Sequence, residues 1–122
     1  MKHNQSGEDY LEAILLLSNE LEHIHQIDVA RKMNVSQPAV QKALKILKGN
    51  AYIETDGLHI FLTEQGKRYA QEIYHRHCTI RRFLVLHGVD DEVADGDACE
   101  MEHCVSPATF AAMEKFVNEN GK

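Results

Sequence analysis

Three residues near the carboxyl end of the chain carry side chains that bind metal ions. Glu102 and His103 follow Cys99 by three and four residues in the stretch ACEMEHCVS. A helix would place all three on one face. A thiol, a carboxylate and an imidazole that share one face predict a metal site.

Two other segments supply further donors. Asp9 and Glu12 lie three residues apart near the amino end, and His77 lies midway along a predicted long helix. The complete set of candidate ligands is Asp9, Glu12, His77, Cys99, Glu102 and His103. It is mainly oxygen and nitrogen with one sulfur, which suits Fe²⁺ or Mn²⁺ with five or six ligands more than structural zinc.

Each ligand also has an ordinary structural interpretation. Asp9 and Glu12 could be acids stabilised by the amino end of a helix, and Cys99 could be a small buried residue. Cys78 and Cys104 are assigned to that buried class, because neither shares the Cys99 face cleanly. The six residues together favour a metal site over these separate explanations.

The composition describes a small globular protein. The chain has 122 residues, 43% of them apolar, and a formal net charge of −6. No apolar run approaches the roughly 20 residues that span a bilayer, and the start has no signal-peptide core. Three cysteines are a poor disulfide framework. We therefore expect a cytoplasmic protein with no membrane contact and no organic cofactor.

Charge is divided unevenly along the chain. Residues 28–52 carry five basic side chains and one acidic, whereas residues 88–122 carry nine acidic and two basic. A basic segment joined to an acidic one indicates two separate tasks. The net charge therefore does not exclude nucleic acid as a partner.

Hydrophobic spacing predicts a mainly helical fold. Helices are expected at residues 10–21 and 26–33, and a third should begin after Ser36 and end at Gly49-Asn50. Two short strands flank Asp56-Gly57, a hairpin signal. A long helix should run over residues 63–88, another from residue 90 or 91 to 104, and a last one from Ser106-Pro107.

Helix, helix, turn, helix and hairpin in this order predict a winged helix-turn-helix, with the third helix in the major groove of DNA. The candidate DNA-binding residues are Ser36, Gln37, Pro38, Gln41, Lys42, Lys45 and Lys48. The glutamines can read base edges and the lysines can meet phosphates. The wing itself is not basic, since Glu54 and Asp56 lie near its tip with His59 as the one potential cation. The alternative is a solvated surface helix.

The whole chain resembles the diphtheria toxin repressor and manganese transport regulator (DtxR/MntR) family. The resemblance rests on EDYLEAI, VARKMNVSQPAVQKALKILKGNAYI, LTEQGKRYA, YHRH and CEMEHCVS. It implies a winged-helix DNA-binding domain at residues 1–72 and an all-helical dimerisation and metal-binding domain at residues 73–122. The SH3-like third domain of longer members is not expected. The implied function is a homodimeric, metal-activated transcriptional repressor at a palindromic operator controlling metal homeostasis.

The resemblance also bears on the ion. Asp9, His77, Glu102 and His103 fall on ligand positions shared or nearly shared across the family. Asp9 and Glu12 look like the manganese branch, whereas Cys99 looks like the iron branch. Arg81 stands where an ancillary-site carboxylate is usual, and Asp95 where the iron branch has histidine. One or two ions per subunit are expected, Fe²⁺ or Mn²⁺, with a slight lean to Fe²⁺ because thiolate favours the softer ion.

Three other classes stay open on the residues alone. The first is a metal-independent winged-helix regulator that responds to thiol oxidation or an organic ligand. The second is a small metalloenzyme, which would leave the DNA-reading elements unexplained; we therefore expect no enzymatic activity. The third is a zinc-stabilised structural module, which would unfold when its metal is removed.

Overall fold

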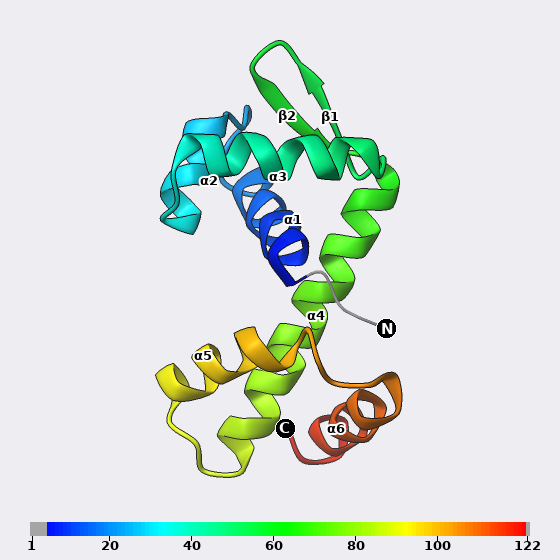
Figure 1. Ribbon diagram of the computed structural model, residues 1–122. Helices are drawn as coiled ribbons and strands as arrows, with labels where there is room; N and C mark the ends of the chain where they lie inside the picture. Colours follow the sequence, from blue (N-terminus) through cyan, green and yellow to red (C-terminus); the bar gives the residue numbers. More distant parts are fainter. Residues whose placement is uncertain (1–4, 122) are drawn as a thin grey trace. The chain divides into compact units, whose positions relative to one another are not determined.

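The computed structural model describes residues 5–121, which form helices and one two-stranded hairpin (Figure 1). The chain divides into two compact units, one ending at Gln71 and the other beginning at Glu72. The first unit holds α1 (Gln5–Ser18), α2 (Gln26–Met33), α3 (Gln37–Gly49), β1 (Ile53–Asp56) and β2 (His59–Leu62). Helix α4 (Glu64–Leu86) begins in the first unit and continues into the second, which also holds α5 (Asp91–Met101) and α6 (Pro107–Asn120).

The first unit is the predicted winged helix-turn-helix. Its core includes the fully buried side chains of Leu11 on α1, Val29 on α2 and Val40 on α3. The turn between α2 and α3 passes through Asn34 in the left-handed conformation, with φ 56°, a conformation that asparagine tolerates better than most residues. Ser36 then caps α3 by accepting a hydrogen bond from the Ala39 amide. The predicted bounds of α2 and α3 are confirmed.

Helix α1 differs from the sequence expectation at both ends. It covers Gln5–Ser18 instead of residues 10–21. The apolar spacing does not detect the earlier turns because Glu8 is buried there as a polar residue, hydrogen-bonded by the hydroxyl of Tyr69. Leu21, counted in the apolar stripe, is 38% exposed and lies beyond the helix. Asp9 and Glu12 are therefore inside α1, so the explanation as acids at a helix start is wrong.

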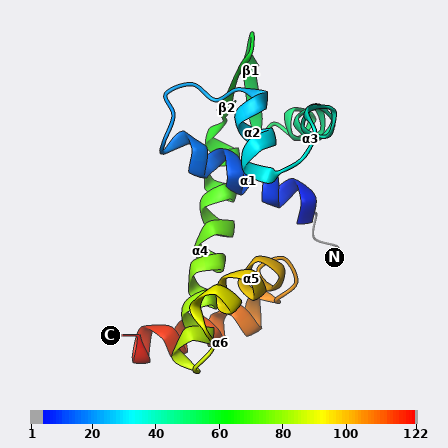
Figure 2. The same cartoon turned by 90° about the vertical axis from the view of Figure 1, so that its left-hand side faces the viewer.

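The wing is a short hairpin of β1 and β2 (Figure 2). Its strands are antiparallel, with Ile53 paired with Leu62 and Asp56 with His59. The two loop residues are Gly57 and Leu58, one position later than the predicted centre. Gly57 has φ 61°, which glycine adopts without strain. The hairpin prediction is confirmed.

The second unit is entirely helical in its described residues. Its core joins Ile80 of α4, Ala98 of α5 and Met113 of α6. Thr63 caps α4 by accepting from the Gly66 amide, and Ser106 caps α6 by accepting from the Thr109 amide. The expected fold, a winged helix-turn-helix followed by an all-helical domain, is confirmed.

One element of this unit is shorter than predicted. Helix α5 ends at Met101 and not at residue 104. The amides of Cys104 and Val105 both donate to the Met101 oxygen, in the turn that leads to the Ser106-Pro107 start of α6. Cys104 is exposed and Cys78 is half-buried, so the assignment of both to buried core is wrong.

Among the described residues, no helix is both long enough and apolar enough to cross a membrane.

The start of α4 packs closely against the segment that enters the wing. A methyl group at Gly66 would lie 1.9 Å from the backbone oxygen of Tyr52. We expect Gly66→Ala to lower the free energy of unfolding by about 1–3 kcal/mol, the usual range for overpacking. Urea denaturation followed by circular dichroism measures the change.

The matched control is Gly49→Ala, at the last residue of α3, where no atom lies within 4 Å of the added methyl group. Alanine there should leave stability unchanged or raise it by less than about 1 kcal/mol. Equal effects of the two substitutions would contradict the close approach of Gly66 and Tyr52.

Candidate metal centre and nucleic-acid interface

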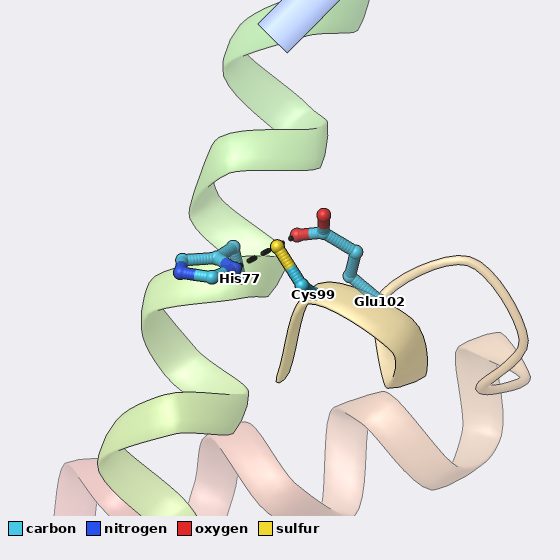
Figure 3. A group of neighbouring side chains, drawn as sticks. All are labelled: His77, Cys99 and Glu102. Atoms are coloured by element: carbon cyan, nitrogen blue, oxygen red, sulfur yellow. Dashed lines mark ion pairs between the residues drawn. The ribbon is translucent and has the colours of Figure 1, made fainter. Parts of the chain in front are cut away.

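Three of the predicted ligands converge in the second unit. His77 comes from α4, Cys99 from the last turn of α5, and Glu102 from the residue that follows α5 (Figure 3). One donor atom of each lies within 4.8 Å of the others. Glu102 keeps helical dihedral angles, φ −59° and ψ −24°, so the face predicted for Cys99 and Glu102 persists past the end of the helix.

Glu102 is the most buried member of the cluster. Its side chain is 1% exposed, and its oxygens lie 3.3 Å from His77 Nδ1 and 3.3 Å from His103 Nε2. Neither oxygen accepts a hydrogen bond within the described part of the chain, nor does His77 Nδ1 have a hydrogen-bond partner there. Burying a carboxylate without hydrogen bonds is unfavourable. The arrangement therefore fits a divalent cation, with nitrogen, oxygen and sulfur donors around it.

The second nitrogen of His77 is held by a residue that sequence reasoning did not include among the functional set. His77 Nε2 donates to Asp95 Oδ1 at 2.8 Å. Metal-binding histidines commonly donate their other N–H to a carboxylate, which fixes the ring and its tautomer. Asp95 is thus a positioning residue for His77. The signal was present, since Asp95 precedes Cys99 by four residues on α5, and Glu102 follows Cys99 by three, just past the end of that helix.

The surroundings of His77 favour its protonated form. The Cys99 sulfur and then the Glu102 carboxylate raise the pKa of His77 to about 11, against the opposing effect of burial. The ring therefore carries a proton at neutral pH in the absence of a metal ion. A cation that bound Nδ1 would have to displace that proton, so metal affinity rises with pH.

Arg81 takes part in a neighbouring ion-pair network. Its guanidinium lies 2.6 Å from Asp91 and 4.0 Å from Asp95. This positive group adjoins the carboxylate that orients His77. It reduces the negative charge available to a second cation on this side of α5.

Four of the six predicted ligands thus lie together in one unit: His77, Cys99, Glu102 and His103. Asp9 and Glu12 belong to α1 in the other unit, and both side chains are half-buried. Their participation in the same centre stays a prediction.

The predicted DNA-reading residues line the solvent side of α3 and its cap. All seven, Ser36, Gln37, Pro38, Gln41, Lys42, Lys45 and Lys48, are exposed. Ser36 uses its hydroxyl as the helix cap, Gln41 donates to the side chain of Gln26, and Lys48 donates to Thr55 on β1. The positive face of α3 is therefore tied to α2 and to the wing by side-chain contacts.

Sequence models of two domains of one family match most of the chain. Residues 3–58 match the model described as iron dependent repressor, N-terminal DNA binding domain. Residues 63–121 match the one described as iron dependent repressor, metal binding and dimerisation domain.

Curated relatives and solved structures agree with these matches. The transcriptional regulator MntR of Escherichia coli O6:H1 is 40% identical over 115 residues, which is 93% of this chain and 74% of the relative. An HTH-type transcriptional regulator of Methanocaldococcus jannaschii is 34% identical over 95% of each chain. The structure of the manganese regulator SloR has a TM-score of 0.82 and 33% identity; the match covers 97% of this chain but 55% of SloR.

The hydrogen bond from His77 to Asp95 can be tested through metal affinity. We expect Asp95→Asn to weaken the binding of a divalent cation by about 10- to 100-fold, since carboxylates that orient metal-binding histidines have effects of this size. Competition with a fluorescent chelator measures it. Asp97→Asn, at another exposed acid on α5, is the matched control and should bind as the unaltered protein does. Identical affinities for both variants would contradict the role of Asp95.

Proposed function

Since the chain belongs to the iron-dependent repressor (DtxR/MntR) family of metal-dependent transcriptional regulators, we propose that it represses transcription as a homodimer when a divalent cation occupies the centre at His77, Cys99 and Glu102. Family membership makes it a DNA-binding regulator and not an enzyme. The observation that carries the proposal is the buried Glu102 carboxylate, which has two imidazoles and a thiol as its neighbours.

We propose that Asp9 and Glu12 of α1 complete the ligand set, which would join the DNA-binding unit to the metal-binding unit. Support comes from their spacing of three residues on α1 and from the family membership of the chain. Without a cation, these carboxylates and Glu102 are like charges and repel one another. A bound cation supplies the positive charge that reverses this repulsion. A cation can shift the equilibrium only by its preference for the DNA-binding state.

Mn²⁺ is the activating ion in this proposal. The earlier lean to Fe²⁺ rested on the Cys99 thiolate alone and is not supported, since SloR is a manganese regulator. Oxygen and nitrogen donors outnumber sulfur in the proposed set, as Mn²⁺ prefers. One principal ion per subunit is proposed, because the Arg81 guanidinium lies beside Asp91 and Asp95 and disfavours a second cation there.

For DNA, the proposal places α3 in the major groove, with Gln37 and Gln41 at base edges and the lysines at phosphates. The two copies of α3 in a twofold dimer would read the two halves of a palindromic operator. The exposure of all seven residues on one face supports this assignment.

One observation favours a second candidate, regulation by thiol oxidation. Cys99 is exposed, so an oxidant can reach its sulfur, and that sulfur lies beside the His77 ring. A regulator of that kind would bind DNA in the presence of a chelator and respond to peroxide. Metal dependence of DNA binding separates the two candidates.

The metal switch is tested by operator affinity under anaerobic conditions. With DNA from the protein's own promoter region, we expect Mn²⁺ to raise affinity by about 5- to 150-fold, the usual range of allosteric coupling. Glu102→Gln and His103→Ala should each abolish the response yet leave the dimer intact by size-exclusion chromatography.

Glu100→Gln, at an exposed acid two residues from Glu102, is the matched control and should respond normally. Fe²⁺ is titrated in parallel, and a larger effect of Fe²⁺ would reverse the assignment of the ion. If neither ion changes affinity for this DNA, the metal switch is wrong.

The DNA interface is tested separately from the metal centre. Lys45→Ala should weaken binding to operator and unrelated DNA alike, since a phosphate contact carries no base specificity. Its Mn²⁺ affinity should be unaltered. Lys115→Ala, an exposed lysine of α6, serves as control and should bind DNA normally. Unchanged DNA affinity in Lys45→Ala would remove this face of α3 from the interface.

A further inference from the structure

The chain segment before α2 runs alongside the wing. Ile24 forms an antiparallel bridge with Ile60 of β2, and the Ile60 amide donates to the Ile24 oxygen at 2.9 Å. Both isoleucines are buried. Because side chains alternate between the faces of an extended segment, the neighbours of these two residues turn to the opposite face.

Those neighbours include three histidines. His23 and His25 flank Ile24, and His59 precedes Ile60. The rings of His23 and His59 stack with centroids 4.4 Å apart, and the ring of His25 meets the edge of His59 at 4.9 Å. The backbone pairing thus gathers three imidazoles on one side of the wing.

Asp28 lies beside one of the three rings. The backbone amide of His25 donates to Asp28 at 2.8 Å, and His25 Nδ1 lies 3.5 Å from the same carboxylate oxygen. The Asp28 carboxylate therefore places a negative charge next to the three imidazoles. His23 is exposed, and His25 and His59 are partly exposed.

We propose that His23, His25 and His59 form a second metal site, separate from the principal centre and specific for a borderline ion such as Zn²⁺ or Co²⁺. Three imidazoles with water as the fourth ligand suit such ions, whereas Mn²⁺ favours carboxylates. The rings of His23 and His59 stack at 16° in the structure, so binding requires them to turn about their side-chain bonds.

The site has a consequence for the wing, and this step rests on the proposed DNA-binding function. Strands β1 and β2 and their loop contain Glu54 and Asp56 but no lysine or arginine. A divalent ion held by the three histidines adds positive charge to this acidic hairpin. The wing would then attract a DNA phosphate that it otherwise repels.

The test uses the full chain with the principal centre disabled by Cys99→Ser and Glu102→Gln, titrated with Co²⁺ and followed by visible absorption. We expect one bound Co²⁺ with the spectrum of nitrogen and water ligands and no thiolate charge-transfer band. Adding His59→Asn or His23→Asn should lower the affinity by more than about tenfold, the lower end of effects at metal sites.

His75→Asn is the matched control, because His75 is an exposed histidine of the other unit, paired with Glu114. It should leave Co²⁺ affinity unchanged. Co²⁺ binding that survives both wing substitutions, or that falls equally with His75→Asn, overturns the proposal. If His59→Asn proves unfolded by circular dichroism, His23→Asn on the exposed loop decides alone. Mn²⁺-dependent operator binding is measured on the unaltered protein, so failure of either proposal is recognised independently.

Discussion

The Glu102 side chain holds a carboxylate almost entirely out of water, and both of its oxygens face imidazole nitrogens. Burying a charged group without an opposite charge beside it lowers the stability of the fold by several kcal/mol. In the absence of metal the proton on His77 provides that opposite charge, and the Cys99 sulfur together with the Glu102 carboxylate raises the pKa of the ring. The proton and a divalent cation are alternative positive partners for one carboxylate. The second unit is therefore organised around a charge that requires a counterion.

The packing of α5 gives this centre its dimensions. Ala94 and Ala98, both fully buried, form its inner side, and Ala98 contacts the core made with Ile80 and Met113. Small residues at these positions let α5 lie close to α4. The ligand-bearing stripe of Asp95, Cys99 and Glu102 occupies a neighbouring face, so donor atoms from two helices come within reach of one ion. The distances between the donor atoms therefore depend on Ala94 and Ala98, whose side chains have no metal-binding atoms.

Features encoded by neighbouring residues were predictable from the sequence. Ser36 and Gly49-Asn50 mark the ends of α3, and Asp56-Gly57 marks the hairpin within one residue. The spacing of Cys99, Glu102 and His103 predicted that they lie close together, and in the structure Glu102 does lie close to both Cys99 and His103. The spacing of Asp95 from Cys99 and Glu102 indicated a shared helix face, but its hydrogen bond with His77 joins positions 18 residues apart on two helices and follows from their packing. The early start of α1 was missed because a buried glutamate interrupts its apolar stripe. The roles of Asp9 and Glu12 stay predictions.

The small cationic face of α3 limits what one subunit can do alone. It presents Lys42, Lys45 and Lys48, while the hairpin beside it contributes no lysine or arginine. Each neutralised phosphate releases roughly 0.9 of a condensed counterion, so three lysines displace only about three. A single copy would hold DNA weakly, and two linked copies gain through effective concentration. Because each occupied operator needs two subunits, its occupancy at low expression would follow the square of the subunit concentration. The cellular concentration of the protein would then control repression together with the metal.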